Sequence, residues 1–253
     1  MFKYSKAQMI TVSMLFLVVI SITAILFFAL SDKDEKLKKI PQKIVTILII
    51  VSEIIKYSLI LSAKNYSLLY PSYYCSFLWF WLLFADFTKG RFADSCEAIS
   101  LCGSFSVTVL MIISPTSIIG DSVESLFSSY LSFHHLLFHG LVILHLSLAL
   151  FLKTFKIKKS YFLYVFIWVM ILCAVIIPRA YIASENCMNV LTSPISILES
   201  IRLQFGQIIY DIILVGLLLF VLETISAVFY LSYAKLSKKE EVLESDAKVL
   251  DNK

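Results

Sequence analysis

The chain has 253 residues, of which 59% are hydrophobic and 16% are charged, and its mean hydropathy is +0.87. A soluble domain of this length has no core large enough for so much apolar surface, so the composition excludes a soluble protein and predicts an integral membrane protein. The net charge of +4 indicates membrane topology rather than nucleic-acid binding, and we expect no nucleic-acid partner.

Seven stretches are apolar enough to cross a bilayer, because a hydrocarbon core of about 30 Å needs roughly 20 residues at a helical rise of about 1.5 Å. The expected spans are Ala7–Leu30, Ile44–Ser62, Tyr73–Phe87, Ser95–Ile113, Tyr130–Leu152, Tyr161–Ile177 and Gln207–Ala234, with no proline inside any of them. The third is the shortest. The sequence therefore predicts an all-α, polytopic seven-helix transmembrane bundle, a single domain over residues 1–234, with a charged, disordered tail at 235–253.

The Lys and Arg residues are distributed unequally between the two sides of these seven spans. One side receives 16 of them, including all five in the tail, whereas the other side receives 5. Cytoplasmic loops of membrane proteins carry the excess of positive charge. We therefore expect the N-terminus outside, the tail in the cytoplasm, and a location in the plasma (inner) membrane, with a bacterial origin.

Common soluble-enzyme motifs are missing from the sequence. It contains no P-loop, no Gly-rich dinucleotide fingerprint and no G-x-S-x-G elbow. Its five cysteines are odd in number and form no C-x-x-C, so they indicate neither a disulfide framework nor a zinc ribbon. Chemistry must therefore come from polar residues inside the membrane, and we expect no cofactor.

Ionisable residues in the expected spans are functional candidates, since a charge in hydrocarbon is costly unless it is paired or hydrated. Glu53 and Lys56 are three residues apart in the second span, hence neighbours on one helix face, and we expect a structural or site-supporting ion pair. Asp211 lies about one turn into the seventh span, where it faces either a site or water.

Two further carboxylates lie close to the expected cytoplasmic ends of their spans. Asp86 and Glu97 flank a short loop that contains Lys89 and Arg91. The sequence favours ion pairing at the level of the lipid headgroups for both of them.

All four histidines of the chain fall in one segment, Phe133–Leu146, within the fifth span. His135 and His139, at i and i+4, share one helix face, and His134 and His145 share a neighbouring face. For a lone histidine an interhelical hydrogen bond is the simplest explanation. Four histidines on one side of a helix make a functional site almost as well supported as interhelical hydrogen bonds.

Four short segments resemble, in order and spacing, the YwaF-type family of bacterial membrane proteins. They are YPSYYC (Tyr70–Cys75), ISLCGSFSVTVLMIISP (Ile99–Pro115), YLSFHHLLFHG (Tyr130–Gly140) and SENCMNVLTSP (Ser184–Pro194). That family is related to the eukaryotic multi-pass acyltransferase that builds polyunsaturated ether phospholipids. The resemblance implies that His139 is the histidine of the fifth span, Glu53 the acidic residue of the second span and Asn189 the asparagine of the last long loop.

The segment before the third span departs from the family pattern. In the eukaryotic branch a cysteine that carries the acyl group directly follows the proline and a histidine follows it, but here these positions hold Ser72 and Tyr73. The resemblance places the bacterial-type cysteine at Cys75. Ser72 and Cys75 therefore both remain candidates for the nucleophile.

The sequence thus predicts a lipid acyltransferase or esterase that acts on a membrane phospholipid or acyl lipid at the outer leaflet. His139 would be the base for Ser72 or Cys75, with Lys56, Tyr73 and His135 as supporting residues. The loop between Pro178 and Gly206 would cover the cleft and bring Asn189 or Arg202 to a phosphate or a carbonyl.

Two alternatives use the same residues. A metal-dependent lipid hydrolase would bind zinc through His135 and His139, with Glu53 or Asp211 as a third ligand, although we expect no metal. A transporter or receptor-like binding protein would use Glu53, Lys56 and the histidines to relay protons or to hold a ligand.

Overall fold

The structure is a computed structural model that describes residues 5–65, 69, 73–115, 123–155 and 157–251, and within these residues every regular element is helical. The helices are α1 (Lys6–Leu30), α2 (Glu35–Ser62), η2 (Tyr74–Phe77), α3 (Leu78–Phe87), α4 (Arg91–Ile113), α6 (Val123–Leu126), α7 (Tyr130–Phe151), α8 (Ser160–Ala183), η3 (Cys187–Asn189), α9 (Ser196–Phe205) and α10 (Gln207–Asp251). Six of them, α1, α2, α4, α7, α8 and the part of α10 up to Lys235, are long and apolar enough to cross a membrane. The prediction of an all-α, polytopic membrane protein is confirmed.

The third predicted span is built differently from the other six. A 3₁₀ turn, η2, leads into α3, and together they form the shorter apolar segment Tyr74–Phe87. The ten residues of α3 rise about 15 Å, about half of the thickness of a hydrocarbon core. Leu78, Trp81 and Leu82 are buried, in a helix that packs against α2 and α4. A seventh crossing therefore stays a prediction.

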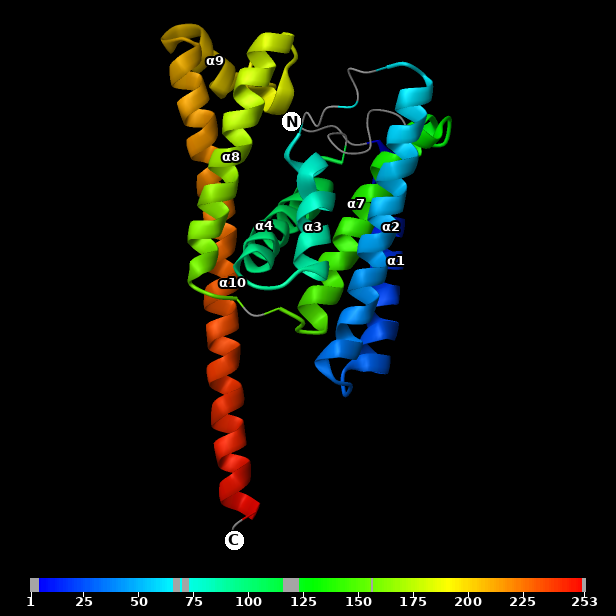
Figure 1. The fold of residues 1–253 in the computed structure, drawn as a ribbon, viewed down its shortest axis with the longest axis vertical. Coiled ribbons are helices and arrows are strands. Elements are labelled where there is room, and N and C mark those ends of the chain that lie inside the picture. The colour runs from blue at the N-terminus through cyan, green and yellow to red at the C-terminus, as the bar shows by residue number, and fades with distance from the viewer. Residues whose placement is uncertain (1–4, 66–68, 70–72, 116–122, 156, 252–253) are drawn as a thin grey trace.

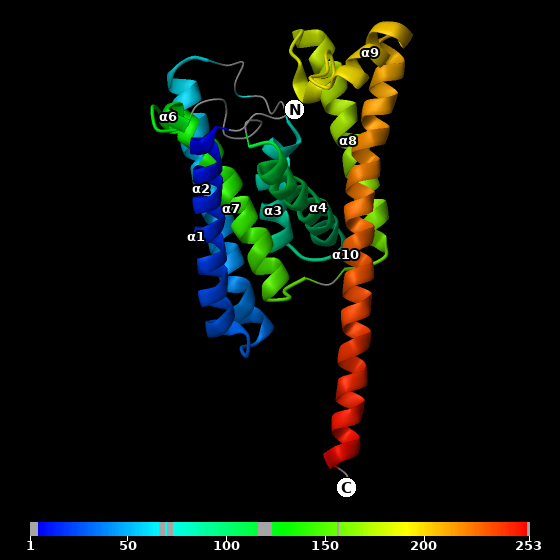
Figure 2. The ribbon, with the colours of Figure 1, turned by 180° about the vertical axis from the view of Figure 1, so that it is seen from behind.

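The helices form two groups joined by a central pair. Figure 1 shows α1, α2 and α7 side by side, α8 and α10 on the opposite side, and α3 and α4 between them; Figure 2 shows the same grouping from behind. Packing follows this arrangement, since α7 contacts α1 and α2, α3 contacts α2 and α4, and α4 and α10 both contact α8. The central pair links the two groups.

Two helices contain prolines that we expected outside the spans. Pro41 lies inside α2 because Asp34 caps the helix ahead of it: the backbone N–H of Leu37 donates to Asp34 Oδ1 at 2.8 Å. Pro178 lies inside α8, which continues to Ala183. A proline removes one backbone donor but does not by itself end a helix whose other hydrogen bonds form. Both helices therefore extend beyond the expected spans and include the flanking prolines.

The last helix extends beyond the expected end of the seventh span at Ala234. α10 continues as one helix to Asp251, so the backbone of the charged tail is helical in this structure as far as that residue. The expected mobility of the tail stays a prediction.

Large apolar side chains cover the outer faces of the bundle. On α1, for example, Ile20, Ile25 and Phe28 are 62%, 67% and 81% exposed. Helices satisfy all their backbone hydrogen bonds internally, so such faces are stable against lipid and costly against water. The exposed surface is thus that of a protein surrounded by a bilayer.

Candidate functional site

A cavity of about 1120 Å³ lies between the two helix groups. Its walls come from α2, η2, α4, α7, α8, the η3 loop and α10, so that most of the bundle contributes to it. Pockets for drug-sized ligands have volumes of about 300–1,000 Å³, so this cavity is large enough for a bulkier ligand. Of the predicted site residues it brings together Glu53, Lys56, Tyr73, Cys75, His135, His139 and Asn189. Their chemical roles stay predictions.

Glu53 links α2 to α7 at the polar wall of this cavity. It is only 3% exposed, forms an ion pair with Lys56, and has its Oε1 3.2 Å from His134 Nε2. The Lys56 ammonium also lies over the ring of Tyr57, 4.6 Å from its centroid. The predicted Glu53–Lys56 pair on one helix face is therefore present, and His134 completes a buried cluster that balances the carboxylate charge.

His139 is oriented by its own helix. Its Nδ1 lies 2.6 Å from the backbone carbonyl of His135. A carbonyl only accepts hydrogen bonds, so Nδ1 carries a proton, and in the neutral imidazole Nε2 is then an acceptor. The side chain is 6% exposed, and its ring meets Phe138 edge-on at 5.3 Å. His139 thus has the tautomer that a general base at the cavity wall needs.

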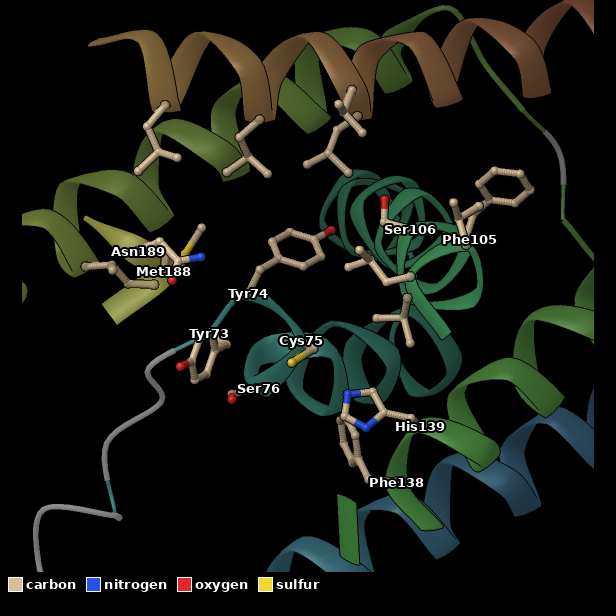
Figure 3. Close-up of a pocket in the computed structure, with 18 of the residues that line it drawn as sticks. Tyr73, Tyr74, Cys75, Ser76, Phe105, Ser106, Phe138, His139, Met188 and Asn189 are labelled. Atoms are coloured by element: carbon tan, nitrogen blue, oxygen red, sulfur yellow. The ribbon is translucent and has the colours of Figure 1, made fainter. Parts of the chain in front are cut away.

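Cys75 lies in η2, where Tyr74 fixes the backbone. The Tyr74 hydroxyl donates to the Ile99 carbonyl at 3.0 Å and lies directly over Gly103, where an added Cβ would be 2.3 Å from that oxygen. Cys75 is a free thiol, and Figure 3 shows its sulfur and the His139 ring facing the same part of the cavity. Within the described part of the chain no hydrogen bond joins the two side chains.

The η3 loop closes one end of the cavity and carries Asn189. This residue has a left-handed backbone (φ 60°), which asparagine tolerates better than most residues. The Tyr210 hydroxyl donates to its carbonyl, and Gln207 Nε2 donates to the Val190 carbonyl at 2.6 Å. Two side chains of α10 therefore hold the loop in place, with Asn189 at the cavity end seen in Figure 3.

The same loop is braced from α8. Arg179 donates to Cys187 Sγ at 2.9 Å and to Glu185 Oε2 at 2.6 Å. Asn186 accepts from the backbone N–H groups of Leu191 and Thr192 at 2.9 and 3.1 Å. Cross-links on both sides of η3 indicate a fixed loop, as a substrate-positioning residue requires.

Two predicted site residues, Arg202 and Asp211, are absent from the cavity lining among the residues that the structure describes. Arg202 pairs with Glu199 on α9, and hydrogen bonds from Arg202 and from the Ser193 backbone lower the pKa of Glu199 to about 2. Asp211 accepts from Tyr181 and, at 3.0 Å, from Gln207. Ser72 lies outside the described residues. The loop thus brings Asn189 to the cavity wall but leaves Arg202 bound to its own carboxylate.

The zinc alternative needs a third ligand beside His135 and His139. Among the residues that the structure describes, no three His, Cys, Asp or Glu side chains are grouped closely enough to hold a metal ion. His139 Nδ1 is directed to a carbonyl, and Glu53 is engaged by Lys56 and His134. The geometry therefore gives the zinc hypothesis no support.

A second histidine–carboxylate contact lies away from the cavity. His145 Nε2 donates to Asp86 Oδ2 at 2.9 Å, and the Thr46 hydroxyl donates to the same oxygen. Nearby, the Tyr161 hydroxyl donates to Glu97 at 2.7 Å. Interhelical contacts of this kind replace the headgroup-level pairing with Lys89 and Arg91 that we expected for Asp86 and Glu97.

Sequence reasoning missed the apolar walls of the cavity. Its long side, Leu214–Ile225 of α10, and Phe105 of α4 consist of residue types that also face lipid. Only the packing of the helices distinguishes a cavity wall from a lipid-facing surface, so no signal in a single sequence identifies them.

Comparison with known proteins gives one match. The sequence model described as the TMEM164 family matches residues 3–240, a range that includes all the cavity-lining residues. No curated protein and no solved structure matches the chain. Because the match covers nearly the whole chain, this protein belongs to the TMEM164 family of multi-pass membrane proteins.

Proposed function

We propose that this protein is a membrane acyltransferase or esterase that takes an acyl chain from a phospholipid, with Cys75 as nucleophile and His139 as general base. The observation that carries this proposal is the position of a free thiol and a correctly oriented imidazole on the wall of one large, mainly apolar cavity. Ser72, the other candidate nucleophile, lies outside the described residues, and the proposal names Cys75 because its place on the cavity wall is described.

The reaction follows from ordinary thiol and imidazole chemistry. His139 Nε2 takes the proton of the Cys75 thiol, and the sulfur attacks the ester carbonyl carbon of the lipid. As the carbon–oxygen ester bond breaks, the leaving alcohol oxygen of the lysolipid takes the proton back from His139. The acyl group is then held as a thioester. An acceptor hydroxyl, or water in the esterase reaction, reverses these steps: it gives its proton to His139, and the thiolate leaves and is reprotonated.

Asn189 fits the role of a donor to the oxyanion that forms during both steps. Its amide carries two N–H donors, and no hydrogen bond to that amide occurs within the described residues. Lys56 and His135 also line the cavity, which places a cation and an imidazole within the part that would receive the polar headgroup. The remaining wall is mainly apolar and suits acyl chains.

The proposal includes seven crossings, an N-terminus outside and a cytoplasmic C-terminus. In Figure 1 the turns α1–α2, α3–α4 and α7–α8 lie at the end of the bundle from which the C-terminal part of α10 extends. These are the connections that carry most of the loop lysines and arginines. The cavity residues lie toward the opposite end, so the substrate would be a lipid of the outer leaflet.

The resemblance of four segments to the YwaF-type proteins, and through them to the ether-phospholipid acyltransferase, supports the same reading of His139 and Cys75. Ser72 and Tyr73 replace the cysteine and histidine of the eukaryotic branch, so the bacterial-type cysteine, Cys75, is the thiol left for the role of nucleophile. Bacterial inner membrane is the proposed location.

The test is acyl transfer by purified protein reconstituted with isotopically labelled phosphatidylethanolamine and a lysophospholipid acceptor. We expect labelled acyl chain in the acceptor or as free fatty acid, and loss of both products in Cys75→Ala and His139→Ala. Cys173→Ala is the matched control, because Cys173 is a second thiol on the same cavity wall. Full activity of Cys75→Ala and His139→Ala would overturn the proposal.

A further inference from the structure

We infer that α10 forms one side of a closed-ended slot for an acyl chain and that Phe105 at its end sets the longest chain that fits. This inference rests on the proposed function for its substrate class, but its geometry is independent of catalysis.

The α10 wall has the length of one leaflet. The lining residues of α10 extend from Leu214 to Ile225, eleven steps along the helix, which corresponds to about 16 Å. One leaflet of a bilayer contributes half of a hydrocarbon core of about 30 Å. The wall is therefore about as long as an acyl chain in one leaflet, so a chain that lies along it fits over most of its length.

Phe105 closes the end of the slot that lies farthest from Asn189. Figure 3 shows Asn189 and Phe105 at opposite ends of the cavity, with Cys75 between them. Behind Phe105 the two helices meet directly, since its ring packs edge-on against Phe229, with centroids 5.4 Å apart. Cys102 Sγ also lies 3.6 Å from Ser226 Oγ. Because α4 and α10 are in contact there, a chain cannot extend past Phe105.

The two hydroxyls that line the closed end are already satisfied. The Ser106 hydroxyl donates to the Cys102 carbonyl at 2.9 Å, and the Thr224 hydroxyl donates to the Phe220 carbonyl at 2.7 Å. Both hydroxyls are bound within their own helices, so neither favours a polar ligand end. The closed end therefore suits the methyl end of a chain, with its ester near Cys75.

The slot opens sideways toward the bilayer. Its lining residues Leu110, Leu217 and Phe220 are 48%, 43% and 69% exposed, and they lie on α4 and α10. In a membrane this exposed apolar edge faces lipid. An acyl chain can thus move from the leaflet into the slot without passing through water. We therefore infer that the occupant is a membrane lipid rather than a soluble acyl carrier.

The test varies Phe105 and the length of the chain. We would measure transfer from a homologous series of saturated phosphatidylcholines, and compare wild type with Phe105→Ala and Phe105→Trp. Phe105→Ala should move the preferred chain to longer lengths and Phe105→Trp to shorter ones. Each additional methylene that becomes buried should change the relative rate by about fourfold. Phe92→Ala, at the other end of α4 and outside the cavity, is the matched control and should leave the length profile unchanged.

A binding measurement separates this inference from the proposed function. Competition of the same phosphatidylcholines with a photoreactive phosphatidylcholine, in a Cys75→Ala background, reports chain preference without turnover. Opposite shifts for Phe105→Ala and Phe105→Trp in binding would support the slot even if wild type transferred no acyl chain. An unchanged length profile in both variants, or a shift in the same direction in both, would overturn it even if wild type were active.

Discussion

Two histidine sites on α7 differ in what surrounds them. Toward the N-terminal end of the helix, His139 lines a cavity with Cys75, and its Nε2 is left as an acceptor because Nδ1 binds the His135 carbonyl. Two turns further on, His145 donates to Asp86, is equally buried at 6% exposure, and lines no cavity described above. The same residue type thus lines a cavity in one place and ties helices together in the other, and the difference comes from the neighbouring space and hydrogen bonds.

The second site is a closed junction of three helices. Asp86 of α3 accepts from His145 of α7 and from Thr46 of α2. A further tie, from the Thr154 hydroxyl to Gln42, joins the same part of α2 to the end of α7. Buried polar groups satisfied in this way fix the packing of helices in lipid. We therefore expect variants of the two sites to separate activity from stability.

The largest effect is expected for His139. His139→Gln removes the proposed general base. General bases contribute about 10²–10⁴-fold to such reactions, so acyl transfer should fall by about that factor. His145→Gln should keep transfer, per folded molecule, within a few-fold of wild type. Rates measured side by side in the same reconstituted membranes provide the check, and equal losses in the two variants would remove the distinction between the sites.

The Glu53 cluster should show the next largest effect, on stability. Glu53→Gln leaves the Lys56 ammonium and His134 without their buried carboxylate, a loss of up to about 3–5 kcal/mol by analogy with broken buried ion pairs. The double variant Glu53→Gln, Lys56→Met removes the unpaired charge and should recover part of that loss. Thermal unfolding in detergent measures both. If the double variant is less stable than the single one, the cluster is not a charge-balanced unit.

The closed junction should show a smaller effect. His145→Ala leaves a largely buried Asp86 with Thr46 as its remaining hydrogen-bond donor among the described residues, which should cost about 1–3 kcal/mol of stability. Thermal unfolding again provides the measurement. A variant as stable as wild type would show that the junction adds nothing to helix packing.

An effect no larger than that of His145→Ala is expected where a methyl group disturbs Tyr74. Gly103→Ala forces its new Cβ against the Tyr74 hydroxyl and should cost about 1–3 kcal/mol through overpacking, with some loss of transfer because η2 and Cys75 move. Gly216→Ala on α10 is the matched control, because nothing lies within 4 Å of an added Cβ there. Comparable unfolding temperatures and rates for both variants would show that Tyr74 does not position Cys75.

The fold class followed from the sequence because hydropathy over roughly 20 residues is a local property. The pairing of Glu53 with Lys56 was also local, since both lie on one turn of α2. The partner of Asp86 was not, because His145 is 59 positions away in the chain, and we expected Asp86 to pair with the nearer Lys89 and Arg91. Sequence distance hides such contacts until the helices are placed.

The candidate site was predictable to a similar extent. His135 and His139 were predicted because they are polar residues in an apolar span, and Cys75 and Asn189 were predicted from the resemblance to the YwaF-type family. All four line the cavity, whereas Phe105 and the α10 wall were not predicted. Arg202 was predicted for the site because it lies in the same loop region as Asn189, but in the structure its charge is taken by Glu199, three residues earlier on α9. Residue type indicates that a group is costly to bury, and only the packing shows what it faces.

The most direct test of the central claim is the mass of the acylated protein. Wild-type protein mixed with phospholipid and quenched in acid should carry one acyl group, which peptide mapping should locate at Cys75 and neutral hydroxylamine should remove as a thioester. Cys173→Ala should behave as wild type, and Cys75→Ala should carry none. An acyl group at Ser72 or Cys173 in its place, or sustained transfer by Cys75→Ala, would contradict the account.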